Sequence, residues 1–246
     1  VDMQLFWILD NIGKSEALIA RNGSGIEKPK DLAGKKVGVP FVSTSHFHLL
    51  LALNDIWRLK ANEVQILNMQ PPQIVAAWQR GDIDAAYVWP PALTEIMKTG
   101  KEIANSEEIG AKTVPTFDGI VVDKDWAAKN PKFMAAFTEV LAKSYQGFDA
   151  RKGSLTPDSP EIKGIVKMIG GTPADIVSAM NLLLFPDVKE QASDVWLGGG
   201  AQGGAVKALT ASAKFLKAQR QINAPLGDYT PFVTSGFADE AAKTVK

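Results

Sequence analysis

The chain of 246 residues contains no cysteine and only two histidines. Without cysteine it has no disulfides, no thiolate nucleophile and no cysteine-based metal site. His46 and His48 stand two positions apart, where a helix would turn them to different sides, and no third metal ligand lies near them in the sequence. We therefore expect neither a bound metal nor a serine-histidine-aspartate triad.

The chain also lacks an excess of charge and a long apolar run. It has 27 basic and 27 acidic residues, so it offers no field that would attract nucleic acid or an anionic membrane. No apolar run approaches the roughly 18 residues that a transmembrane helix needs. With 46% hydrophobic residues, the chain can bury the core of one large domain or two modest ones.

Predicted strands and helices alternate in the first half of the chain, and helices dominate after Lys124. The expected strands are residues 3–9, 17–20, 37–39, 64–68, 83–89 and 116–122, and the later helices are 125–147, 160–169, 173–184 and 205–220. Residues 228–237 read as a loop, followed by a short polar segment. The alternation predicts an α/β fold with a parallel sheet, whose ligands bind beyond the carboxyl ends of the strands.

No leader sequence precedes the first predicted strand, which follows Val1 almost directly. A secretory signal peptide would place a basic segment and an apolar segment there. We therefore expect that a leader has been removed or that the natural start lies further upstream.

Three hydroxyl side chains stand between a predicted strand and a predicted helix, at Ser43, Thr44 and Ser45. The first turn of a helix has unpaired N–H groups and a partial positive charge, so it can hold an anion without arginine or lysine. A sulfonate, sulfate or phosphate group would fit such a turn. The alternative is that one of the three hydroxyls only caps the helix.

His46 follows these hydroxyls and is a weaker candidate donor. The helix dipole disfavours a cation at this end, so we expect a neutral imidazole that either donates to the ligand or packs.

Several segments resemble the taurine- and aliphatic-sulfonate-binding subunits of bacterial ABC importers. They are residues 12–18 (IGKSEAL), 39–46 (VPFVSTSH), 70–72 (QPP), 76–89 (AAWQRGDIDAAYVW) and 228–229 (DY). The resemblance implies a two-lobed periplasmic binding protein type II fold with a ligand cleft between the lobes. It assigns residues 1–22 and 119–246 to lobe I and 23–118 to lobe II, with crossing strands at 16–22 and 119–124.

The resemblance also implies a function without chemistry. A periplasmic monomer would bind taurine without a cofactor and deliver it to the transmembrane permease of the importer. Members of the family carry further parts of lobe I, including a serine-bearing loop, ahead of the position of Val1. We therefore expect some ligand contacts to lie outside this chain.

Taurine carries an ammonium group, which needs a carboxylate or an aromatic face when it is buried. Asp118 is the first candidate for this role, with a turn aspartate as its alternative. Glu16 is the second, although a salt bridge at the hinge would explain it nearly as well. Trp89 is expected to lay its ring on the ligand unless it packs in the core, and Asp10 is expected to reach the cleft.

Other readings remain open. Gly198–Gly203 matches the glycine pattern of dinucleotide-binding folds, but no strand precedes it, so we expect no cofactor there. The ligand is taurine, another alkanesulfonate or a sulfate ester. An effector-binding domain of a transcription regulator is a further alternative, whereas a related enzyme of thiamine-precursor synthesis relies on a cysteine motif that this chain lacks.

Overall fold

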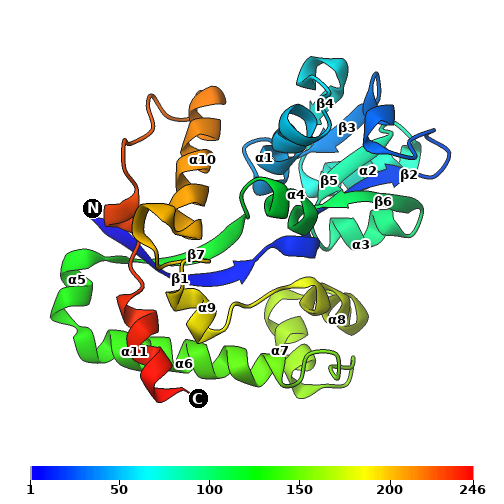
Figure 1. The fold of residues 1–246 in the computed structure, drawn as a ribbon. Helices are drawn as coiled ribbons and strands as arrows, with labels where there is room; N and C mark the ends of the chain where they lie inside the picture. The colour runs from blue at the N-terminus through cyan, green and yellow to red at the C-terminus, as the bar shows by residue number, and fades with distance from the viewer. Residues whose placement is uncertain (1, 246) are drawn as a thin grey trace. The chain divides into compact units, whose positions relative to one another are not determined.

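The computed structural model describes residues 2–245, apart from the side chain of Ile169. The chain packs into two compact units, each built from separate stretches of sequence (Figure 1). Unit 1 comprises Val1–Asn11, Thr116–Ser154 and Leu184–Lys246, and unit 2 comprises Ile12–Pro115 and Leu155–Leu183.

Unit 2 is built on a five-stranded sheet with the strand order β4-β3-β5-β2-β6. The strands are β2 (Ala17–Arg21), β3 (Lys36–Val39), β4 (Gln65–Asn68), β5 (Ala85–Val88) and β6 (Gly100–Asn105). β3 runs parallel to β4 and β5, as predicted, but β2 runs antiparallel to β5 and β6. The expectation of a parallel sheet is wrong for β2, which lies between β5 and β6 and runs opposite to both, an arrangement that needs no crossover helix between neighbouring strands.

Helices of unit 2 begin where they are predicted after residue 43 and at residues 160 and 173, whereas the helix that begins at Ser106 was not predicted. The helices of this unit are α1 (Thr44–Leu51), α2 (Pro71–Arg80), α3 (Ala92–Met97), α4 (Ser106–Lys112), α7 (Pro160–Ile169) and α8 (Pro173–Leu182). Short turns complete the unit: η1 (Gly13–Ser15), η2 (Pro29–Leu32), η4 (Ala61–Glu63) and the π-helical turn η3 (Ala52–Ile56), which continues α1.

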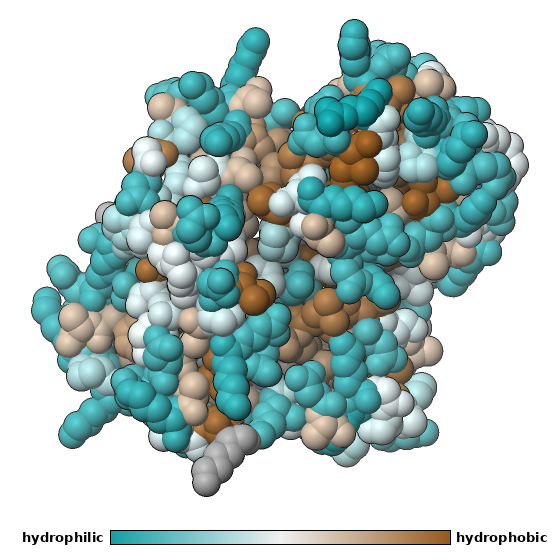
Figure 2. Space-filling view, viewed as in Figure 1, coloured by the Kyte–Doolittle hydropathy of each residue, from teal (hydrophilic) through white to brown (hydrophobic). Residues whose placement is uncertain are grey.

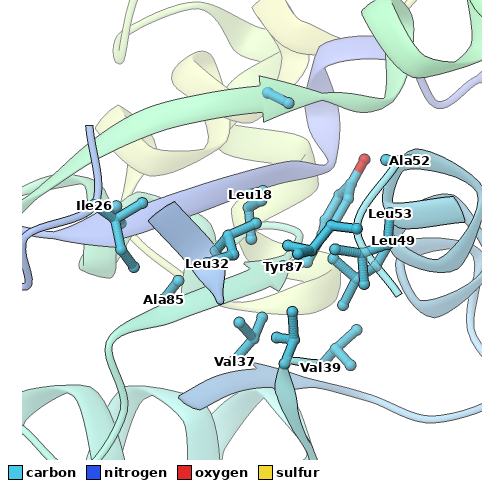
Figure 3. Packing of buried hydrophobic residues seen from close by; sticks show 14 of the residues in the cluster. Leu18, Ile26, Leu32, Val37, Val39, Leu49, Ala52, Leu53, Ala85 and Tyr87 are labelled. Carbon is cyan, nitrogen blue, oxygen red and sulfur yellow. The ribbon is translucent and has the colours of Figure 1, made fainter. Parts of the chain in front are cut away.

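Both faces of this sheet are buried, and successive side chains of a strand pack on opposite faces. Leu18 of β2 joins a cluster with residues of β3, α1 and α4 (Figure 3). Its neighbour Ile19 joins a second cluster with residues of α2 and α3. Because both faces are covered, β5 consists of four buried residues in succession, instead of alternating buried and exposed ones.

Unit 1 contains a two-stranded antiparallel sheet surrounded by helices. Its elements are β1 (Met3–Asn11), β7 (Phe117–Asp123), α5 (Lys124–Lys129), α6 (Pro131–Asp149), α9 (Val188–Ala192), η5 (Gly200–Gln202), α10 (Gly204–Ala218), η6 (Thr230–Phe232) and α11 (Gly236–Thr244). Phe6, Trp7 and Ile8 of β1 anchor the core, together with Trp196 and residues of α6 and α11. Asn130 and Pro131 interrupt the single helix expected from residue 125 onward.

The division of the chain differs from the expected lobes in three places, the shortest of which is residues 116–118, at the start of β7 in unit 1. Residues 12–22 lie in unit 2, because β2 pairs with β5 and β6. Residues 155–183 also lie in unit 2, where Leu182 of α8 packs against the cluster on the α2 side of the sheet.

The surface of the described residues is mixed in polarity. Figure 2 shows hydrophilic side chains over most of the visible face, with apolar residues in small patches between them. Over residues 2–245, no helix combines the length and the apolar character that crossing a membrane requires.

Candidate ligand-binding site

The turn between β3 and α1 holds the predicted anion-binding residues, and its first hydroxyl is a helix cap. The Ser43 hydroxyl accepts a hydrogen bond from the His46 N–H group (3.1 Å) and donates one to the Pro40 carbonyl (2.6 Å). Both bonds lie within the turn, so this hydroxyl is committed to local structure. For Ser43, the alternative of a plain N-cap is the one that the structure supports.

The Thr44 hydroxyl is also committed, but to a residue distant in sequence. It donates to one carboxylate oxygen of Glu16 (2.5 Å), and the Ser106 hydroxyl donates to the other (3.3 Å). The Tyr87 hydroxyl lies 2.8 Å from the same Ser106 oxygen. Glu16 is only 4% exposed and is held by the first residues of α1 and α4, where the helix dipoles favour a negative charge.

Other donors in the first turn of α1 remain available. The backbone N–H groups of Thr44 and Ser45 have no hydrogen-bond acceptor among residues 2–245. The Ser45 hydroxyl is fully buried and likewise has no partner within this part of the chain. A buried polar group without a partner is costly, so these donors mark a place where a ligand with acceptor oxygens would be stabilised.

His46 lies in a packed, neutral environment. Its ring stacks on Phe41, with centroids 4.3 Å apart, and its Nδ1 atom accepts a hydrogen bond from the Val42 N–H group (3.3 Å). An Nδ1 atom that accepts carries no proton, and burial lowers the pKa of this histidine. Of the two expectations for His46, the neutral packing role agrees with these contacts.

Trp89 directly follows β5 and is partly buried against the cluster formed with α2 and α3. This position matches the alternative of core packing. Its role as a ligand residue stays a prediction.

The two predicted aspartates lie side by side in unit 1. Asp10 of β1 and Asp118 of β7 are paired in register, and the Asp118 N–H group donates to an Asp10 carboxylate oxygen (3.3 Å). Asp10 is 8% exposed, whereas Asp118 is exposed. Burial, followed by the charge of Asp118, raises the pKa of Asp10 from 3.8 to about 6.

Sequence reasoning missed the residues that support Glu16. Tyr87 read as an ordinary strand residue, and Ser106 was not singled out. The sequence Asn105-Ser106-Glu107-Glu108 carried a usable signal, because an asparagine before acidic residues is typical of a helix start.

The glycine run after Trp196 forms a tight turn. A side chain at Gly203 would collide with the Gly198 carbonyl, and one at Gly204 with the Val195 carbonyl, so glycine is required there for close packing. The residues before it form the short helix α9 and a turn, and no strand of the described chain leads into them.

The two histidines make different contacts. His46 stacks on Phe41, whereas the Nε2 atom of His48 lies 3.0 Å from the Val114 carbonyl oxygen. No group of three or more potential metal ligands occurs among residues 2–245.

Comparison with known proteins gives sequence relatives along nearly the whole chain. Residues 12–150 match the family described as "NMT1/THI5 like". The taurine-binding periplasmic protein of Escherichia coli is 37% identical over 237 residues, which cover 96% of this chain and 71% of that protein. A putative binding protein of Brucella abortus is 29% identical over 140 residues, covering 55% of this chain and 42% of the relative.

Solved structures share the fold at lower identity. The periplasmic aliphatic sulphonate binding protein of Escherichia coli gives a TM-score of 0.69 at 20% identity, covering 97% of this chain and 75% of that chain. A desulfurization enzyme gives 0.64 at 13% identity, covering 100% and 80%. The fold is therefore two-lobed and α/β, and by itself it does not separate binding proteins from enzymes. The sequence relationships decide the family: the chain belongs to the NMT1/THI5-like family, in the group of periplasmic binding proteins for taurine and aliphatic sulfonates.

Proposed function

We propose that the protein is the periplasmic substrate-binding subunit of an ABC importer and that it captures taurine for delivery to the membrane permease. The name of the Escherichia coli relative supports taurine as the ligand, since the identity extends over 96% of the chain. The protein would act as a monomer, without a cofactor and without catalysing a reaction.

The observation that carries this proposal is the set of unpartnered donors in the first turn of α1. A sulfonate stays ionised throughout the physiological pH range and offers three acceptor oxygens. The N–H groups of Thr44 and Ser45, with the Ser45 hydroxyl, supply donors without a positive side chain. Residues 40–46 contain neither lysine nor arginine, so the peptide dipoles would provide the attraction.

The ammonium group of taurine needs an acidic partner. Asp118 stays our first proposal, because its carboxylate is exposed and its neighbour Asp10 adds negative charge at the same point of the sheet. Glu16 is the weaker choice, since both of its carboxylate oxygens already accept hydrogen bonds from hydroxyl groups.

Thermal unfolding of the full-length protein with a ligand panel tests the proposal. Taurine at about 100 times its dissociation constant should add roughly 2.7 kcal/mol to the free energy of unfolding. Glycine and acetate, which lack the sulfonate, should produce no such rise. Asp118→Ala should remove the taurine response, whereas Asp125→Ala, which also removes an exposed acid of unit 1, should preserve it.

The panel also separates the possible ligands. A larger response to a longer alkanesulfonate or to a sulfate ester would replace taurine as the ligand and keep the binding role. If no sulfonate raises the unfolding temperature, the proposed function is wrong.

A further inference from the structure

The buried carboxyl group of Glu16 lies very close to the donors proposed to bind the sulfonate. One carboxylate oxygen of Glu16 is 2.5 Å from the Thr44 hydroxyl oxygen, and the unpartnered Thr44 N–H group belongs to the same residue. Covalent geometry therefore places the carboxylate within about 6 Å of that N–H group. An anion bound there would be attracted by the amides and repelled by Glu16.

The hydrogen bonds around Glu16 fit the ionised form and hold it in place. Hydroxyl groups of Thr44 and Ser106 donate to its two oxygens, and the Tyr87 hydroxyl is within hydrogen-bond distance of Ser106. An ionised carboxylate only accepts, so each hydroxyl hydrogen points toward it. The Thr44 hydroxyl cannot then donate to a ligand, which leaves the amides and the buried Ser45 hydroxyl for that task.

We infer that Glu16 is a specificity-determining residue, which restricts the α1 turn to tetrahedral groups with a single negative charge and excludes dianions such as sulfate. This inference rests on the proposed function.

The physical basis is how each energy depends on the charge of the ligand. Attraction by the amides and repulsion by Glu16 both grow in proportion to that charge. The cost of removing the ligand from water grows with the square of the charge. Because Glu16 reduces the net attraction, the balance can favour binding of a monoanion while a dianion is rejected.

The variant Glu16→Gln tests this through a ratio of affinities. Loss of one negative charge should tighten binding of methanesulfonate roughly tenfold and binding of sulfate by about the square of that factor, because sulfate carries twice the charge. A purely structural defect would change both affinities by a similar factor and in the same direction. Glu63→Gln is the matched control, because it removes an exposed acid of the same unit and retains an acceptor for the Lys60 N–H group, and it should leave the ratio unchanged.

A measurement on the unaltered protein covers the case in which Glu16→Gln does not fold. Methyl phosphate changes from a monoanion to a dianion near pH 6, like other phosphomonoesters. Its binding should weaken at least tenfold more than that of methanesulfonate between pH 5 and pH 7.5. Methanesulfonate keeps one charge throughout, so it reports any titration of the protein itself.

The outcomes separate the two proposals. If the unaltered protein binds neither taurine nor methanesulfonate, the proposed function is wrong, and the role of Glu16 falls with it. Two results on a protein that binds sulfonates would overturn only the inference about Glu16. In the first, Glu16→Gln increases the affinity for sulfate no more than the affinity for methanesulfonate. In the second, the affinities for methyl phosphate and methanesulfonate change in the same way between pH 5 and pH 7.5.

Discussion

At the scale of single residues, Asp10 is a group whose ionisation at neutral pH lowers the stability of the fold. Its carboxyl group is largely buried, and its neighbour across the sheet is a second acid, Asp118. Both features favour the protonated form, and burial is the larger cause of the rise in pKa from 3.8 to about 6. The folded protein therefore binds this proton more tightly than the unfolded chain does.

The raised pKa of Asp10 makes the free energy of unfolding depend on pH. Between pH 3.8 and about 6 the folded state keeps a proton that the unfolded state has lost, so this contribution to stability falls as pH rises through that window. Asp10→Asn mimics the protonated form and retains an acceptor for the Asp118 N–H group. We expect the variant to be more stable than the wild type by about 2 kcal/mol at pH 7.5 and nearly equal to it at pH 4.

Urea unfolding at the two pH values measures this difference. Asp118→Asn is a useful companion, because it removes only the charge effect of the neighbour and should give a smaller gain at pH 7.5. A wild type that is as stable as Asp10→Asn at pH 7.5 would contradict the buried, proton-binding role of Asp10.

Single residues also mark the limit of what the sequence could predict about the site. The hydroxyl cluster at Ser43 to Ser45 was recognisable from its position before a helix. The partner of Thr44 was not, because Glu16 stands 28 positions away and meets it only through the packing of β2 beside the other strands. Sequence patterns predict donors well, but tertiary contacts decide which donors stay available for a ligand.

At the scale of elements, the turn between β3 and α1 contains local backbone strain. Val42 has a φ angle of +62°, in the left-handed region that β-branched residues avoid. This conformation accompanies the bond from the Val42 N–H group to His46 and precedes the Ser43 cap. The contacts of this turn therefore hold Val42 in a conformation that valine disfavours, and the turn sets the direction of the unpartnered amides of Thr44 and Ser45.

Val42→Asn should relieve this strain. Asparagine enters the left-handed region more readily than valine does, and Val42 is 42% exposed, so little apolar burial is lost. We expect a gain of about 1 kcal/mol in the free energy of unfolding, measured by urea titration. Val195→Asn is the matched control, since Val195 is 50% exposed and is not among the residues with positive φ. A loss of stability in Val42→Asn equal to that of the control would argue against strain.

Most elements could be predicted from periodicity, and those that were missed have weak patterns. The predicted strands correspond to β1–β5 and β7, and the predicted helices to α1, α5 with α6, α7, α8 and α10. β6 was missed because Ile103 and Ala104 are its only apolar residues. α11 read as a polar segment because its buried face consists mainly of the alanines Ala238 and Ala241, which become apolar contacts only when the core of unit 1 surrounds them.

At the scale of the whole molecule, the chain contains separate cores that share no residue. Leu18 belongs to a cluster drawn entirely from unit 2, and Ile8 to a cluster drawn entirely from unit 1. Side-chain packing makes unfolding cooperative within a cluster, so a loss of packing in one unit should be felt first in that unit.

Two matched truncations test whether the units lose protection separately. Leu18→Ala and Ile8→Ala each remove a fully buried aliphatic side chain from a strand, and each should lower the free energy of unfolding by about 2–5 kcal/mol. In amide hydrogen exchange, Leu18→Ala should lower the protection of β3 and β5, while the β1–β7 pair exchanges as in the wild type. Ile8→Ala should produce the reverse pattern. Equal loss of protection in both sheets with either variant would mean that the molecule unfolds as one cooperative body, in spite of its separate cores.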